Sequence, residues 1–416
     1  MFAKTPPKGM RDILPQDLLL RESVLDTIKS TYRSFGFLGI ETPCVEDLAL
    51  LTGKQGGDNE KLIFKILKRG EKLDLNAPLK TETDLCDLGL RYDLTVPLSR
   101  YYACNQGKLP SVFKAMQIGN VWRAERPQKG RFRQFVQCDI DIIGEETFLA
   151  EVELITATSK ALSELGLTNF EIRINDRKML TSFAEFCGFD QAQHEAFFIA
   201  LDKLDKIGMD GVRAELLQHE MSEQNIDKFE KLVSTLVSSD DALTKAGEIN
   251  SEVTKNLQKI IDVTSKTAHK CKIVFDPTLV RGMNYYTGTI FEVSYGDFGI
   301  SIAGGGRYDK MLGMFLGTSV PACGFSIGFE RICTILEQLK VNRHPKQNKI
   351  AFVVDKDLSA EHLQQVLYEC EEQRKQGNIC LLAKKIKNFG FLLKQLQEQG
   401  YSTIYMWDKD SLRKVD

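Results

Sequence analysis

Five short segments carry the charged, aromatic and glycine residues that could do chemistry in this chain. The densest runs from Val121 to Arg133 and holds five basic residues and one acidic residue. Pro127 and Gly130 favour a turn, so we predict two antiparallel strands joined by a basic loop. Guanidinium groups donate forked hydrogen bonds to phosphate oxygens. The spacing therefore indicates a hairpin that could hold an anionic ligand.

The second strand of this hairpin alternates between two kinds of side chain. One face is largely apolar and is predicted to be buried: Gln134, Val136, Cys138, Ile140 and Ile142. The opposite face carries polar and aromatic groups: Arg133, Phe135, Gln137, Asp139 and Asp141. The alternation by itself favours a hairpin with one face in water. The alternative is a sheet platform on which Phe135 stacks against a planar ligand while arginines bind its phosphates.

Two further segments place polar groups where a ligand could reach them. In LRYDLT, alternation puts Arg91, Asp93 and Thr95 on one face, where the acid and the hydroxyl could bind an ammonium group or cap a strand end. In LVRGMNYYTGT, Arg281 stands between apolar residues and glycines, and a buried arginine requires an anionic partner from the protein or from a ligand. The tyrosine pair that follows suits core packing or a binding wall.

Two glycine-bearing segments complete the set. AGGGRYD (303–309) and GFSIGFER (324–331) could let the backbone approach a ligand closely, or could simply turn and pack tightly. The chain has no GxxxxGKS or GxxxxGKT motif and no GxGxxG motif after a strand. The P-loop and dinucleotide-binding classes are therefore excluded.

Composition excludes further classes. The 55 basic and 57 acidic residues give a net charge of −2, and the hydrophobic share of 43% is that of an ordinary globular protein. No stretch of about 18 uncharged apolar residues exists, and the N-terminus lacks the apolar core of a secretory signal. The ten cysteines form no CxxC pair and the five histidines are dispersed. We therefore expect reduced thiols, no bound zinc and a cytoplasmic location.

A sheet assembled from distant parts of the chain must position these segments. Strand patterns lie before and after a helical block at about 178–270, in which apolar residues recur every three or four positions. We expect a core domain over 1–335 with this block as an inserted helical subdomain. A charged linker at 336–348 leads to a tail, 349–416, that alternates strand–helix–strand–helix–strand. That alternation predicts a small α/β domain with mostly parallel strands.

Taken in this order and spacing, the segments resemble the histidyl-tRNA synthetases of class II. VWRAERPQKGRFRQF resembles the second motif of the class, GFSIGFERI the third, and GFLGIETP the first, which in the class lies at a dimer interface. LRYDLT, RGMNYYTGTIFE and AGGGRYD resemble segments of the histidine enzymes. The resemblance implies an α+β fold: a class II antiparallel sheet flanked by helices, an inserted helical subdomain, and a C-terminal α/β domain like an anticodon-binding domain.

The resemblance also implies ATP-dependent activation of L-histidine to histidyl-adenylate and its transfer to tRNA(His). The family's catalytic roles fall on Arg281 and Arg123. Its ATP-binding positions match Arg123, Glu125, Arg131, Phe135, Arg281 and Arg331. Its histidine-binding positions match Asp93, Thr95, Gln137, Asp141, Tyr285, Tyr286 and Tyr308. The implied partners are tRNA(His), L-histidine, ATP with Mg²⁺ on its phosphates, and a second copy of the chain in a homodimer, with no membrane.

Two features depart from the family, and two other functions stay open. Asn284 stands where the family usually has aspartate, and only DKDSLRKVD follows the last predicted strand, so a shortened tail domain is expected. A paralogue without charging activity, such as the regulatory subunit of ATP phosphoribosyltransferase, resembles the same family but usually lacks the tail and much of RGMNYYTG. A purely structural RNA-binding protein would not need Asp93, Thr95 and Gln137 together.

Overall fold

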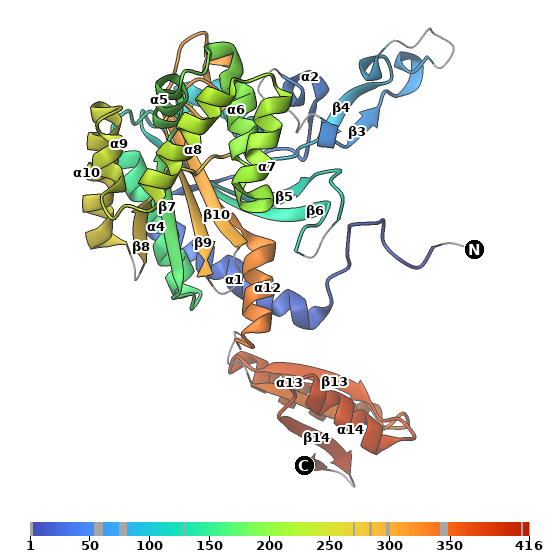
Figure 1. Ribbon diagram of the computed structural model, residues 1–416. Coiled ribbons are helices and arrows are strands. Elements are labelled where there is room, and N and C mark those ends of the chain that lie inside the picture. The colour runs from blue at the N-terminus through green and yellow to red at the C-terminus, as the bar shows by residue number, and fades with distance from the viewer. Residues whose placement is uncertain are drawn as a thin grey trace. The chain divides into compact units, whose positions relative to one another are not determined.

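The structure is a computed structural model that describes residues 3–53, 61–74, 81–127, 130–268, 271–282, 285–296, 300–341, 348–408 and 411–415. The chain divides into two compact units, Met1–Asn342 and Arg343–Asp416. Figure 1 shows the first unit in blue to orange and the second in orange to red. Within the described ranges, no helix is long and apolar enough to cross a bilayer.

An eight-stranded mixed sheet forms the centre of the first unit, in the order β1-β5-β6-β11-β10-β9-β7-β8. Its strands come from distant parts of the chain: β1 (Leu38–Ile40), β5 (Phe113–Trp122), β6 (Gln134–Ile143), β7 (Phe170–Asp176), β8 (Lys272–Phe275), β9 (Thr289–Tyr295), β10 (Ile300–Arg307) and β11 (Ala322–Gly328). β1 is parallel to β5, and β7 is parallel to β8. Every neighbouring pair in the run β5-β6-β11-β10-β9-β7 is antiparallel. The predicted antiparallel-rich sheet is thus built from both sides of the helical block.

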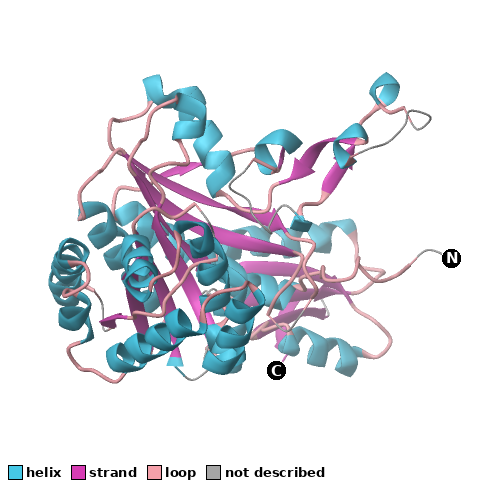
Figure 2. Ribbon diagram, turned by 45° about the horizontal axis from the view of Figure 1, so that its top comes forward, coloured by secondary structure: helices cyan, strands magenta, loops and turns pink. Residues whose placement is uncertain are grey.

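Helices close one face of this sheet, as Figure 2 shows in cyan against the magenta strands. α4 (Leu149–Glu164) and α12 (Phe329–Gln338) pack on the strands, and α1 (Pro15–Ser34) packs on both helices. Cys138, Ile140 and Ile142 of β6 lie in the core on this side, at most 2% exposed, as predicted. Gln134, predicted on the same buried face, is exposed, and Val136 is half-buried, because β6 begins outside the core. The simpler interpretation, in which the other face of β6 lies in water, is wrong. Asp139 and Asp141 on that face are each 4% exposed, because other parts of the chain close over them.

A block of helices interrupts the sheet between β7 and β8. It comprises α5 (Arg177–Cys187), α6 (His194–Leu201), α7 (Leu204–Gln218), α8 (Glu223–Val237), α9 (Ala242–Ala246) and α10 (Ser251–Thr267). Aromatic side chains form part of its interior, where the rings of Phe197 and Phe229 lie 4.8 Å apart edge to face. This block occupies the green and yellow part of Figure 1, beside the central sheet.

A small three-stranded sheet, β2-β4-β3, precedes the main hairpin of the sequence. It contains β2 (Val45–Asp47), β3 (Lys65–Leu67) and β4 (Cys86–Leu90); α2 (Leu48–Leu51) packs on it, and α3 (Thr95–Asn105), which α11 (Gly313–Leu316) contacts, follows. β4 ends at Leu90 and α3 begins at Thr95, so LRYDLT does not continue as a strand. The prediction that Arg91, Asp93 and Thr95 share one strand face was therefore wrong. Arg91 turns away and donates to the carbonyls of Asn120 at 2.9 Å and Thr42 at 2.8 Å.

The second unit is a four-stranded sheet with two helices. Its elements are β12 (Lys349–Val354), α13 (Ala360–Lys375), β13 (Ile379–Lys384), α14 (Phe389–Glu398), β14 (Thr403–Asp408) and β15 (Ser411–Val415). β13, β12 and β14 are parallel, as predicted, whereas β15 pairs antiparallel with β14. The tail sheet is thus one strand larger than the sequence indicated, because its last residues return along β14 instead of ending as a loop.

Candidate functional site

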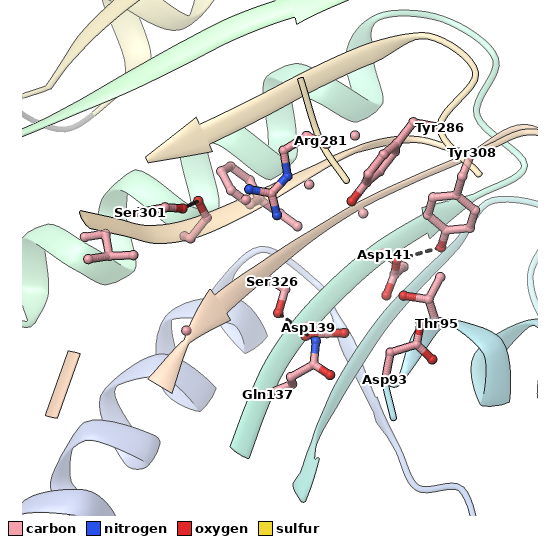
Figure 3. Close-up of a pocket in the computed structure, with 18 of the residues that line it drawn as sticks. Asp93, Thr95, Gln137, Asp139, Asp141, Arg281, Tyr286, Ser301, Tyr308 and Ser326 are labelled. Carbon is pink, nitrogen blue, oxygen red and sulfur yellow. Dashed lines mark hydrogen bonds between the residues drawn. The ribbon is translucent and has the colours of Figure 1, made fainter. Parts of the chain in front are cut away.

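A cavity of about 240 Å³ lies on the polar face of β6. Its walls come from β6, β10 and β11, from the segment before β9 and from the start of α3 (Figure 3). All seven predicted histidine-binding residues line it, and so do four of the predicted ATP-binding residues: Arg123, Phe135, Arg281 and Arg331. The fold therefore gathers into one cavity residues that all five sequence segments contribute.

A smaller hollow of about 130 Å³ adjoins this cavity. Glu125 and Arg131, the two remaining predicted ATP-binding residues, line it, and it shares Arg123, Phe135 and Arg331 with the larger cavity. The guanidinium carbon of Arg123 lies 5.2 Å from the ring centroid of Phe135. The two hollows together offer an aromatic surface with cations at its edge, which suits a planar base that carries phosphates.

Three arginines form the basic part of the cavity wall, and each is held by a protein acceptor. Nε of Arg123 donates to the carbonyl of Tyr92 at 3.0 Å, and Arg331 donates to the carbonyl of Ser301. Nη1 of Arg281 donates to Oε2 of Glu292 at 2.7 Å. Burial, with Arg131 and Arg281 nearby, lowers the pKa of Arg331. An excess of positive charge is therefore concentrated here, and an anionic ligand would relieve it.

Three carboxylates, Asp93, Asp139 and Asp141, form the acidic part of the cavity wall. Burial raises the pKa of Asp93 to about 6, although the Val96 N–H and Arg123 act against the rise. Burial likewise raises the pKa of Asp141 to about 7, against the hydrogen bond that the Tyr308 hydroxyl donates at 2.6 Å. Burial and then the neighbouring Asp141 carboxylate raise the pKa of Asp139 well above its usual range. A cationic ligand would stabilise the ionised form of all three groups.

Glycines make room for two of these charged groups. A Cβ at Gly324 would lie 1.9 Å from Oδ1 of Asp141, and a Cβ at Gly304 would lie 2.6 Å from the guanidinium carbon of Arg281. The glycines of AGGGRYD and GFSIGFER are therefore needed for close approach of side chains across neighbouring strands. This role, room for neighbouring protein side chains, is one that neither interpretation of these glycines from the sequence included.

Three tyrosines also line the cavity. The ring of Tyr285 lies 4.7 Å from Tyr286 and 5.8 Å from Tyr308, centroid to centroid. All three rings are less than 10% exposed. The tyrosine pair of the sequence is thus both packed and part of a binding wall.

The model of the family described as histidyl-tRNA synthetase matches residues 9–332. The chain belongs to the histidyl-tRNA synthetase family. A histidine–tRNA ligase from Leifsonia xyli subsp. xyli is 48% identical over 350 residues, which cover 80% of this chain and 80% of the relative. The family resemblance of the sequence motifs is therefore confirmed.

Two solved structures show how far the histidyl-tRNA synthetase architecture extends along the chain. The histidyl-tRNA synthetase of Nostoc sp. PCC 7120 matches with a TM-score of 0.79 and 26% identity, covering 100% of this chain and 97% of that one. A structure from Bacillus halodurans, described as an ATP phosphoribosyltransferase regulatory subunit/histidyl-tRNA synthetase, has a TM-score of 0.76 over 95% of this chain and 97% of its own. At 20% identity it shows a shared fold alone. The class II fold predicted from the sequence is confirmed.

The family resemblance assigns no role to three residues that shape this cavity, although the strand alternation had placed one of them, Asp139, on the polar face with Gln137 and Asp141. Asp139 and Ser326 line the cavity, and Glu292 holds Arg281. The period-two spacing from Gln137 to Asp141 is a signal that places Asp139 in the site, whereas no local signal points to Glu292 or Ser326, which lie on other strands. Asn284 lies outside the described residues.

The raised pKa values predict how pH affects the stability of the ligand-free protein. Asp141 titrates near pH 4 when unfolded and at about 7 when folded, so the folded state retains a proton that the unfolded chain has lost. Its contribution to stability is therefore present below pH 4 and lost as the pH rises through about 7. The unfolding free energy of the wild type, relative to Asp141→Asn, should fall between pH 5 and 8. Urea titrations at several pH values measure this, and a constant difference would contradict it.

Proposed function

We propose that this chain activates L-histidine with ATP to histidyl-adenylate and transfers the histidyl group to tRNA(His). The observation that supports this most is that one cavity is lined by three carboxylates, Asp93, Asp139 and Asp141, and by three arginines, Arg123, Arg281 and Arg331. An amino acid has an ammonium group and a carboxylate, and ATP has a triphosphate. One cavity with both kinds of charge can hold the ammonium and the phosphates while the two anions meet.

The reaction requires cations more than a general base. An oxygen of the histidine carboxylate attacks the α-phosphorus of ATP, the bond from that phosphorus to the bridging oxygen breaks, and pyrophosphate leaves. The carboxylate is already ionised near pH 7, so no proton has to be removed. In this proposal Arg281 binds at the meeting point of carboxylate and α-phosphate, Arg123 and Arg331 bind phosphate oxygens, and Phe135 lies under the adenine. Preorganised donors of this kind stabilise charge that develops in the transition state.

The imidazole ring of the substrate belongs, in this proposal, beside Asp141 and the tyrosines. Asp141 and Tyr308 are hydrogen-bonded to each other and line the cavity with Tyr286. Buried polar groups that need a ring N–H reject analogues lacking it, by about 10⁴- to 10⁵-fold in comparable sites. Selectivity for histidine would follow from this pairing.

Mg²⁺ would accompany the ATP phosphates and neutralise part of their charge. No group of three His, Cys, Asp or Glu within the described ranges could hold a metal ion without substrate. Glu125, which lines the smaller hollow and pairs with Arg131 at 3.6 Å, and Glu292, which pairs with Arg281 and Arg173, are the carboxylates that would contribute.

A polar groove of about 560 Å³ supports the transfer step. It shares Arg123, Arg281 and Arg331 with the cavity and reaches Lys206 in the helical block. A basic groove next to the reacting groups suits the phosphate-bearing end of a tRNA. We further propose that the second unit binds the anticodon, and that the enzyme works in the cytoplasm, where charged tRNA is used.

A homodimer is the proposed assembly. β1 is the edge strand of the central sheet, and Leu38 on it is 53% exposed. Val45 on β2 and Leu88 on β4 are each 38% exposed. An open sheet edge and exposed apolar side chains are typical of surfaces that a partner covers. Sedimentation equilibrium would test this, with a monomer at micromolar concentration as the contrary result.

Pyrophosphate exchange and tRNA charging test the function directly. Wild-type protein should exchange pyrophosphate into ATP when L-histidine is present, and none of the other amino acids should replace it. It should then attach histidine to a single acceptor in total tRNA. Well-folded protein that binds histidine but supports neither reaction would instead favour the non-charging paralogue, which the intact RGMNYYTG segment and the second unit count against.

A further inference from the structure

Three buried oxygen atoms in the acidic part of the cavity wall have no hydrogen-bond donor among the described residues. They are Oδ2 of Asp93, Oε1 of Gln137 and Oδ1 of Asp139. All three residues line the cavity (Figure 3), and Asp93 and Asp139 are 2% and 4% exposed. A buried acceptor without a donor costs free energy, so native proteins rarely keep one without a purpose. The arrangement calls for a ligand that donates hydrogen bonds at this point.

Hydrogen bonds of the second polar atom orient Asp93 and Gln137. Oδ1 of Asp93 accepts the Val96 N–H at 3.2 Å. Nε2 of Gln137 donates to Oγ of Ser326 at 3.3 Å. Ser326 lies directly across the strand pair from Asp139, so this serine is adjacent to both side chains. One N–H of the Gln137 amide therefore points to Ser326, and its carbonyl oxygen has no donor among the described residues.

We propose that Asp139 is the third acceptor for the α-ammonium group of the amino-acid substrate and completes a tripod with Asp93 and Gln137. This inference rests on the proposed function. An ammonium group carries three N–H donors and no acceptor, so it matches the three free oxygens in number and in kind. Thr95, which the family resemblance places at the same group, lines the cavity but is not among the buried acceptors that lack a donor.

Two other roles for Asp139 lead to different results. An Asp139 that bound the imidazole, like its neighbour Asp141, would matter equally for ligands with and without an ammonium group. An Asp139 that only supported the sheet would lower stability when replaced. If Asp139 binds the ammonium group, its replacement should affect only ligands that carry an ammonium group and should not lower stability. The reason is that the ionised form of Asp139 is buried beside Asp141 at a free-energy cost that only the bound cation offsets.

The Asp139→Asn variant separates these roles, because asparagine keeps the size of the side chain but loses the charge. Affinities are measured by competition for L-histidine, histamine, which keeps the ammonium and the ring, and 3-(imidazol-4-yl)propionate, which lacks the ammonium. The variant should weaken L-histidine and histamine on the order of 10- to 100-fold, as for the loss of a hydrogen bond to a charged group. It should leave imidazolylpropionate nearly unchanged and raise the melting temperature of the ligand-free protein.

Matched variants calibrate the comparison. Asp93→Asn should show the same ligand selectivity as Asp139→Asn, whereas Asp141→Asn should weaken all three ligands. Ser326→Ala, which removes the hydroxyl beside both Gln137 and Asp139, should give a smaller loss with the same selectivity, and it serves if Asp139→Asn does not fold.

Two results would overturn the assignment: an equal loss for histamine and imidazolylpropionate, or no loss for histamine while Asp93→Asn shows one. Absence of histidine-dependent exchange in the wild type would instead refute the proposed function. Intact exchange with unselective Asp139 variants would refute the role of Asp139 alone.

Discussion

Replacing Arg281 with alanine should lower histidine-dependent pyrophosphate exchange by about 100- to 1,000-fold, the usual effect of deleting one preorganised donor at a developing charge. Glu292 holds Nη1 of Arg281 at 2.7 Å, whereas Nε has no acceptor in the part of the chain that the structure describes. Donors therefore remain free for the two anions that react. The fold should persist, because Glu292 retains Arg173 as its other partner.

The control for this variant is Arg213→Ala. Arg213 on α7 pairs with Asp227 at 2.7 Å and Glu230 at 3.1 Å, so its removal also deletes an arginine–carboxylate pair, but at a surface away from the cavity. Exchange should then proceed at the wild-type rate. The circular dichroism spectra of both variants should match the wild type. An unchanged exchange rate in Arg281→Ala would remove this residue from the reaction.

Replacing Glu151 with alanine should destabilise the first unit by about 3–5 kcal/mol, the cost of leaving one member of a buried ion pair without its partner. Glu151 on α4 is 1% exposed, and both of its oxygens accept from Arg307, at 2.8 and 2.7 Å. Arg307 ends β10 and precedes Tyr308, which bonds Asp141. The same change should therefore weaken histidine binding as well as stability.

Tryptophan fluorescence can report on this unit alone. The chain has two tryptophans, Trp122 on β5 and Trp407 on β14, so a Trp407→Phe background leaves a single reporter in the first unit. Urea unfolding in that background measures the loss. Asp227→Ala, which breaks an exposed pair, should leave the midpoint almost unmoved. A urea midpoint for Glu151→Ala as high as the midpoint for Asp227→Ala would show that the Glu151–Arg307 pair is not needed for stability.

The sequence by itself determined the fold class and most of the site, because local geometry carries that information. A strand repeats every two residues, so the spacing in FRQFVQCDID placed Phe135, Gln137 and Asp141 on one face. The recurrence of apolar residues every three or four positions located the inserted helical block. The order of the motifs then predicted that Arg123, Arg281 and Arg331 bind the same ligand, although they lie far apart in the sequence.

Only the tertiary structure decided which of these groups face the cavity and which brace it. Arg91 turned out to hold the backbone, and Glu292, unmarked in the sequence, holds Arg281. Asp139 lies next to Ser326 because the register of β6 with β11 sets the two residues opposite each other. Strand register and side-chain orientation depend on contacts between residues far apart in the chain. Free hydrogen-bonding atoms can therefore be identified only once every potential partner has its place in the fold.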